Sequence, residues 1–176
     1  MRVHVRKYFK GEYKMQNLSQ RKTIRLKDFD YGQNGGYFLT LCIKNRCELL
    51  GKINVGSDDP GAPLVAFSEY GKIVDNYINK IENHYGVSVD KYVIMPNHIH
   101  MIIIVKDSVP GSSRPTMLIP NIIAALKKMT TKEIGFDLWQ TSYHDHIIRN
   151  EEEYWKIWKY IDENPAKWEE DKYYKK

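Results

Sequence analysis

Residues 93–105 read VIMPNHIHMIIIV, and this stretch decides the fold class. Two short apolar runs rich in β-branched residues meet at a Pro-Asn pair, which is typical of a turn. The stretch therefore predicts two neighbouring strands, 87–95 and 98–105. Because side chains alternate between the faces of a strand, every second residue from Ile99 onward is expected to point into the core.

His98 and His100 fall on the other face of the second strand. Residues i and i+2 of a strand are roughly 6.5–7 Å apart, so both imidazoles can reach one metal ion. A lone histidine here would mean little, and two hydrogen-bonded sheet histidines are the ordinary alternative for such a pair. The pattern makes the pair a candidate metal site.

The segments around this hairpin alternate between strand and helix periods. Runs rich in β-branched and aromatic residues predict further strands at 36–43, 49–55, 63–67 and 143–148. Apolar residues at helical spacing predict helices over 69–85, 119–129 and 151–163, the last capped by Asn150 with Glu153 at the capping-box position. Between them, 106–120 reads as a Pro-, Gly- and Ser-rich loop. This order favours an α+β fold with one mainly antiparallel central sheet and flanking helices.

Length and charge narrow the class of protein. The 176 residues suit one domain, and 27 basic against 22 acidic residues give a net charge of +5, which favours polyanionic partners. The longest apolar run, 101–105, is far too short to span a bilayer, and no signal peptide is visible. With two cysteines that we interpret as reduced thiols, we expect a cytoplasmic, nucleoid-associated protein without a membrane partner.

Basic residues concentrate at the N-terminus. Residues 1–27 hold nine Lys or Arg and one acid, so we expect a basic arm, 1–27, before a single domain, 28–176. The arm is either a solvated tail or an extension that contacts phosphates. The residues that we expect to contact nucleic acid are Arg21, Lys22, Arg25, Lys127, Lys128, His146 and Arg149.

A second histidine pair, His144 and His146, flanks Asp145 rather than an apolar residue. Neither face of that segment is clearly apolar, so we place it near an edge of the sheet. For His146, a phosphate or base contact or a structural hydrogen bond is favoured over metal ligation.

The final helix carries a polar flank beside its apolar stripe. At about 100° per residue, Tyr154, Ile157, Trp158 and Ile161 gather toward the core. Tyr160 and Asn164 are i, i+4 neighbours outside this stripe. Taken singly, a tyrosine is most often a packing residue, and Asn164 before Pro165 is a common helix stop.

At this point the chain resembles the REP-associated tyrosine transposases, within the IS200-like group of single-tyrosine, histidine-hydrophobic-histidine nucleases. The resemblance runs from Arg21 to Trp168. The stretches that carry it are RKTIRLKDFDYGQNGGYFLTLCIKNR, VIMPNHIHMIIIV, LWQTSYHDHIIRNEEEYW and KYIDENPAKW. The principal departure is the short tail DKYYKK, with no appended domain.

This resemblance implies a ferredoxin-like sandwich that cuts and rejoins single-stranded DNA at palindromic hairpins. Tyr160 would be the nucleophile, forming a 5′-phosphotyrosine intermediate. His98, His100 and Asn164 would hold Mg²⁺ or Mn²⁺. The expected partner is single-stranded or hairpin DNA, and the protein is expected to be a monomer or a homodimer. No general base is identified, since Glu153 suits helix capping better.

Two other functions stay open on the residues alone. One is a non-catalytic nucleic-acid-binding module of the same fold, in which the histidines only support the sheet. The other is a hydrolytic metalloenzyme acting on a small phosphoester. It ranks last, because the MPNHIH segment offers no carboxylate ligand.

Overall fold

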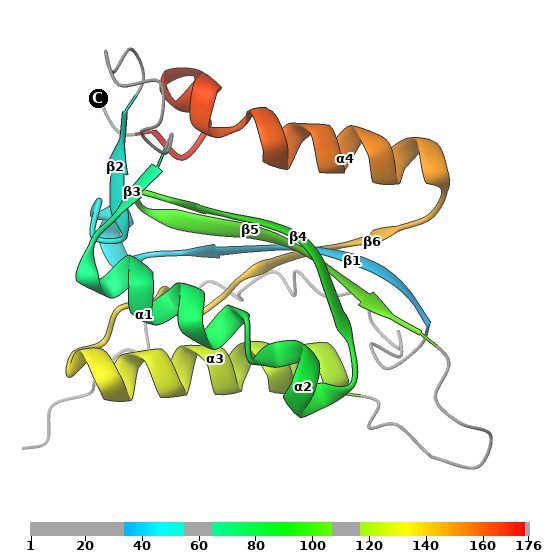
Figure 1. The fold of residues 1–176 in the computed structure, drawn as a ribbon, viewed down its shortest axis with the longest axis horizontal. Coiled ribbons are helices and arrows are strands. Elements are labelled where there is room, and N and C mark those ends of the chain that lie inside the picture. The colour runs from blue at the N-terminus through cyan, green and yellow to red at the C-terminus, as the bar shows by residue number, and fades with distance from the viewer. Residues whose placement is uncertain (1–33, 55–64, 107–116, 175–176) are drawn as a thin grey trace, which may run out of the picture.

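A four-stranded antiparallel sheet organises the molecule (Figure 1). The computed structural model describes residues 34–54, 65–106 and 117–174. The strands, in their order across the sheet, are β4 (Ser88–Met95), β5 (His98–Val105), β1 (Gly35–Cys42) and β6 (His144–Ile148). Since all three neighbouring pairs are antiparallel, the predicted α+β class with an antiparallel sheet is confirmed.

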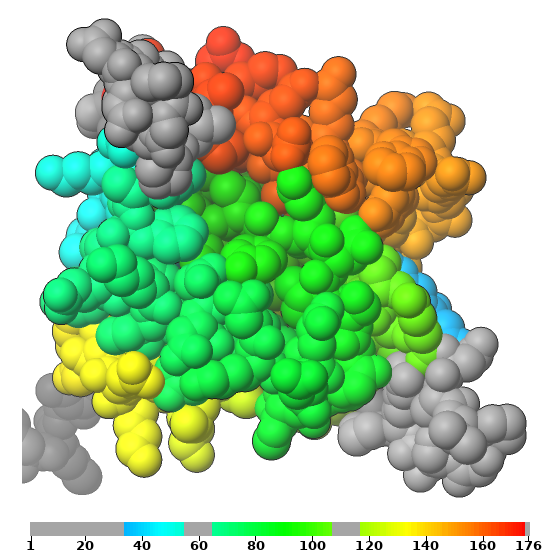
Figure 2. Space-filling view, in the orientation of Figure 1, coloured from blue at the N-terminus to red at the C-terminus, as the bar shows by residue number. Residues whose placement is uncertain are grey.

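Helices cover both faces of this sheet. The helices on one face are α1 (Glu69–Ile78), α2 (Ile81–Tyr85) and α3 (Leu118–Ile134). Across the other face runs α4 (Glu151–Glu163), continued by the short 3-10 helix η2 (Pro165–Glu170). Figure 2 shows this upper layer in orange and red above the green surface of α1 and α2. Among the described helices, none combines the length and apolarity that a membrane crossing needs.

Smaller elements lie at the end of the sheet where β5 begins. Another 3-10 helix, η1 (Lys44–Arg46), follows β1. The strands predicted at 49–55 and 63–67 are confirmed as β2 (Gly51–Ile53) and β3 (Val65–Phe67), which pair antiparallel. The predicted arm, 1–27, lies outside the described residues, so the division into arm and domain stays a prediction.

The core lies between the sheet and α1–α3. Leu39 and Leu41 of β1 are fully buried there, together with Ile99, Met101 and Ile103 of β5. Ile99, Met101 and Ile103 are the alternate residues that the strand pattern assigned to the core. Burying each such side chain stabilises the fold by about 1.5–3 kcal/mol, which anchors β5 from below.

The helix predicted over 69–85 is divided in two, which corrects the sequence interpretation. Helix α1 begins as predicted, since the Ser68 side chain accepts a hydrogen bond from Gly71 N at 3.1 Å. At its end, Lys80 N donates to the Tyr77 carbonyl at 3.2 Å, a tighter i to i+3 bond. The Asn79 amide also donates to the Asp75 carboxylate, at 3.3 Å. The apolar period continues across this turn, so the break leaves no mark in the pattern.

The loop predicted at 106–120 ends earlier in the structure than the sequence analysis placed it. Helix α3 begins at Leu118 and includes Pro120 in its first turn, where the missing N–H of proline costs no helical hydrogen bond. Residues 107–116 lie outside the described part of the chain.

Gly71 allows α1 to approach the segment before β2 closely. A Cβ atom at this position would collide with the Leu50 carbonyl oxygen, which also accepts a bond from Ser68 N at 2.9 Å. We expect Gly71→Ala to lower the free energy of unfolding by about 1–3 kcal/mol, as overpacking does. The exposed Asn76→Ala on the same helix is the control, and denaturant melts of both variants measure the difference. Equal stabilities would contradict this packing.

Candidate active site

The histidine pair lies where β5 begins, directly after the turn through Pro96 and Asn97. Both imidazoles are on the α4 side of the sheet and are completely buried, with 0% exposure. Their Nε2 atoms are 3.0 Å apart. Alternation along the strand therefore brings two nitrogen atoms to one point.

The other nitrogen of each ring is held by a neighbour. His98 Nδ1 lies 2.8 Å from Asn97 Oδ1, which can only accept, so His98 donates through Nδ1 and keeps the Nε2 lone pair. His100 Nδ1 lies 2.8 Å from Thr40 Oγ1, its register partner on β1. Such contacts fix the tautomer and orientation that a metal-ligating histidine needs.

Helix α4 places Tyr160 and Asn164 over the pair. The Tyr160 hydroxyl is 3.2 Å from His100 Nε2, and its side chain is 37% exposed. Asn164 is buried, and its Oδ1 has no hydrogen-bond partner among the described residues. Of the two residues on this flank of the helical wheel, Tyr160 contacts His100 directly, and the Asn164 amide donates to Asp171 beside it.

Asp171 lies at the centre of this group, and the sequence analysis missed it. Its Oδ2 accepts hydrogen bonds from the Tyr160 hydroxyl at 3.0 Å and from Asn164 Nδ2 at 2.7 Å. One ligand atom each from His98, His100 and Asp171 lies within 4.8 Å of the other two. Two imidazoles and a carboxylate make a donor set suited to a divalent cation.

The segment after η2 also covers the histidines. The Tyr173 ring centroid is 4.6 Å from that of His98 and 5.8 Å from that of His100. The Tyr173 carbonyl accepts from Asn97 Nδ2 at 2.9 Å, and Arg46 donates to the preceding carbonyl at 3.1 Å. Residues 171–174, which the sequence analysis treated only as a departure from the resemblance, therefore form one wall of the site.

Burial sets the protonation states here. Desolvation lowers the pKa of His98 to about 4 and the pKa of His100 well below its usual range. Both rings are therefore neutral at pH 7, the form that binds metals. Burial, and next the negative charge of Asp171, raise the pKa of Tyr160, so the phenol keeps its proton until a cation or a base acts on it.

These shifts predict a loss of stability in mild acid. The unfolded chain takes up protons on both histidines near pH 6.5, whereas the folded chain keeps them neutral to about pH 4 in the case of His98. In a chelator, the free energy of unfolding should therefore fall from pH 6.5 downward, by up to about 1.4 kcal/mol per pH unit and histidine. Denaturant melts between pH 7 and 4.5 measure this slope, which the double variant His98→Gln, His100→Gln should flatten. An equally steep slope in that variant would contradict the assignment.

The lysines predicted to contact DNA lie on α3, across the sheet from Tyr160. Lys127 Nζ donates to the backbone carbonyls of residues 140–142, at 2.7, 3.3 and 3.0 Å. Its ammonium group therefore holds the loop before β6 together. Lys128 is exposed on the same helix. The arm residues Arg21, Lys22 and Arg25 lie outside the described residues.

His146 on β6 and Arg149, which follows that strand, both contact Glu153 in the first turn of α4. His146 Nε2 is 2.7 Å from Glu153 Oε1, and Arg149 N donates to Glu153 Oε2 at 2.8 Å. Glu153 N in turn donates to Asn150 Oδ1 at 2.8 Å, so the predicted capping by Asn150 is confirmed. Both carboxylate oxygens of Glu153 are therefore hydrogen-bonded at the N-terminal end of α4, whereas Asn164 lies at its C-terminal end.

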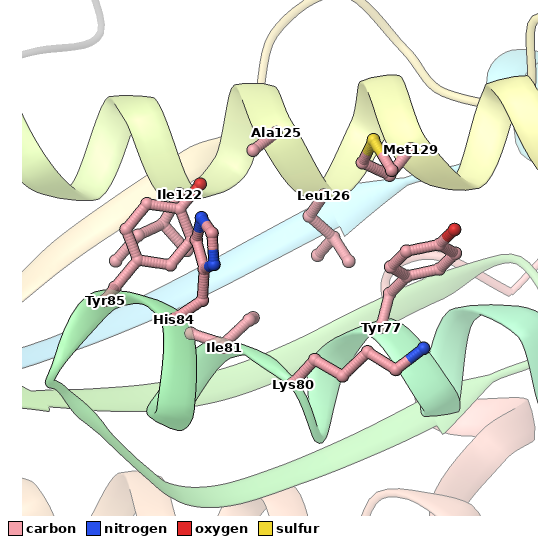
Figure 3. Close-up of a pocket in the computed structure, with 9 residues that line it drawn as sticks. All are labelled: Tyr77, Lys80, Ile81, His84, Tyr85, Ile122, Ala125, Leu126 and Met129. Atoms are coloured by element: carbon pink, nitrogen blue, oxygen red, sulfur yellow. The ribbon is translucent and has the colours of Figure 1, made fainter.

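A mainly apolar pocket of about 310 Å³ lies on the other side of the sheet (Figure 3). The side chains of Tyr77 and Tyr85 face Ile122, Leu126 and Met129 across the space between α1–α2 and α3. The sheet separates this pocket from Tyr160, so it takes no part in the histidine site.

No family model matches the chain. A protein of Haemophilus influenzae (strain ATCC 51907 / DSM 11121 / KW20 / Rd), described only as uncharacterized, is 34% identical over 178 residues. The match covers 89% of this chain and 94% of that protein. The chain belongs to the family of this protein.

Two solved structures are similar in fold to this chain. A REP-associated tyrosine transposase bound to a REP hairpin superposes with a TM-score of 0.57 at 22% identity, over 77% of this chain and 68% of that one. A Deinococcus radiodurans structure, described as a candidate transposase, gives a TM-score of 0.45 at 19% identity, over 78% and 96%. The superposition with a TM-score of 0.57 shows that the chain has the fold of the hairpin-bound transposase.

Proposed function

We propose that the protein is a metal-dependent single-stranded DNA transesterase that cuts and rejoins DNA at palindromic hairpin elements. The observation that carries this proposal is the Tyr160 hydroxyl, which lies 3.2 Å from Nε2 of the buried His100 on a side chain that is 37% exposed and so open to an incoming strand. The hairpin bound to the structural neighbour supports the substrate class.

The donor atoms fit Mg²⁺ or Mn²⁺. His98 and His100 would contribute Nε2 and Asp171 a carboxylate oxygen, a mixed set that Mn²⁺ accepts readily. Asn164 fits as a further ligand, because its buried Oδ1 lacks any partner among the described residues. When bound, the ion would polarise the scissile phosphate and neutralise developing charge.

The protein residues would carry the transfer itself. The Tyr160 oxygen attacks phosphorus, the bond from phosphorus to the 3′ oxygen breaks, and that oxygen leaves with the bonding electrons and takes up a proton from solvent. Asp171 Oδ2 already accepts the phenol hydrogen bond at 3.0 Å, so it is placed to take the proton. The products are a 5′-phosphotyrosyl link and a 3′-hydroxyl, which keep the bond energy for rejoining.

DNA binding would depend on positively charged side chains outside the histidine site. We assign phosphate contacts to Arg21, Lys22, Arg25, Lys128 and Arg149, with smaller contributions from Lys127 and His146, which are engaged within the fold. Such contacts release counterions, so the affinity should fall steeply with salt.

The test is a covalent complex. Labelled hairpin DNA with single-stranded flanks is incubated with the protein and Mn²⁺, then separated under denaturing conditions. A band of protein joined to DNA that requires the metal supports the transesterase. Binding without any such band would leave a non-catalytic DNA-binding module, and hydrolysed ends without an adduct would favour a metal-dependent hydrolase.

A further inference from the structure

The α4 side of the sheet is unevenly covered. Helix α4 is fastened over the β4 edge, where Tyr154 donates to Asp90 at 2.6 Å and Lys91 to Asp162 at 2.6 Å. Lys91 Nζ also lies 4.0 Å from the centre of the Trp158 ring. These contacts hold the helix toward β4 and β5.

The other half of this face, over β1 and β6, carries rings that reach solvent. Register pairs Phe38 with His146 and Thr40 with His144, so these four residues share the face that holds His100. Both β6 histidines are exposed, and Phe38 is half-buried. A strand of the central sheet thus presents an aromatic ring beside two imidazoles.

Phe38 is the member of this group next to the reacting atoms. Its ring centroid is 5.3 Å from that of His100 and 6.2 Å from that of Tyr160, which it meets edge-on. A nucleotide whose phosphate reaches the Tyr160 hydroxyl therefore brings its own base, or that of its neighbour, within reach of Phe38. Unpaired bases stack on aromatic side chains of open sheet faces regardless of sequence.

We infer that Phe38, flanked by His144 and His146, forms a subsite for one unpaired DNA base beside the scissile phosphate. This inference rests on the proposed function. Phe38 acts as a positioning residue, because stacking fixes the nucleotide while Tyr160 carries the chemistry. The occupant is a single-stranded base, since a base inside a duplex hides its flat face.

Two measurements test the subsite. Mixed-sequence single-stranded 20-mers containing 5-iododeoxyuridine are irradiated on the protein, and we expect crosslinks at Phe38. Anisotropy titrations with the same DNA in a chelator should show roughly tenfold weaker binding by Phe38→Leu and wild-type binding by Phe38→Tyr, which keeps the ring.

Phe136→Leu is the matched control, because Phe136 is 42% exposed and contacts Tyr70 of α1, on the far side of the sheet. Phe136→Leu should bind the single-stranded DNA with the affinity of the wild-type protein. Unchanged affinity of Phe38→Leu, or crosslinks that avoid Phe38, would overturn the subsite. The covalent-complex test distinguishes the subsite from the proposed function. If the protein forms the adduct but Phe38→Leu binds DNA as tightly as wild type, only the subsite is wrong. If binding depends on Phe38 but no adduct forms, only the proposed transesterase activity is wrong.

Discussion

Replacing Tyr160 with Phe should abolish the covalent protein–DNA complex and lower cleavage by orders of magnitude. The change removes one oxygen, which lies 3.2 Å from His100 Nε2 and 3.0 Å from Asp171 Oδ2. Because the ring and its contact with Phe38 remain, fold and hairpin affinity should be unchanged.

Tyr154→Phe is the matched control on the same helix. The Tyr154 hydroxyl donates to Asp90, and this bond raises its pKa to about 12. It therefore lies at the β4 edge, away from the histidines, and its loss should leave the adduct intact. Peptide mapping of the trapped complex identifies the residue that is joined to DNA. A DNA-linked peptide without Tyr160 would contradict its assignment as the nucleophile.

Removing either histidine should remove metal binding together with cleavage. Mn²⁺ at a hundredfold excess over its dissociation constant stabilises a folded protein by about 2.7 kcal/mol, which a thermal melt detects. We expect His98→Ala and His100→Ala to lose this stabilisation and to cleave no labelled hairpin. Truncating a buried ring also lowers stability, so each melt is compared with the same variant in chelator.

His84→Ala is the control for this pair, because His84 is exposed on α2, on the opposite side of the sheet. It should keep both the Mn²⁺ stabilisation and cleavage. Wild-type cleavage by both strand variants would show that the pair serves only to support the sheet.

The strand and helix periods predicted most of what positions the site. Alternation in HIHMIIIV separated His98 and His100 from the core residues, because one face of β5 is buried under α1–α3. The helical wheel placed Tyr160 and Asn164 on one flank. It overstated the burial of Tyr154, which lies half-exposed at the β4 edge because its hydroxyl bonds Asp90.

The remaining contacts depend on tertiary structure that no local period encodes. Asp171 reaches the histidines because η2 turns the chain back after Asn164, and nothing in the stretch EEDKYYKK singles out this one of its three acids. Lys127 resembles any exposed helical lysine until the loop at 140–142 turns three carbonyls toward it. The positions of Asp171 and Lys127 both depend on where a distant segment of the chain turns, which a local sequence pattern does not encode.

The closeness of the tail to the histidines has a practical consequence for how the protein is purified. A peptide joined after Lys176 begins only six residues beyond Asp171. A flexible hexahistidine tag there would explore a radius of roughly 15–20 Å and present its imidazoles to the site at about millimolar effective concentration. Such a tag would compete for Mn²⁺ and mask the loss expected of His98→Ala, so affinity handles belong at the other terminus or must be cleaved off before metal is measured.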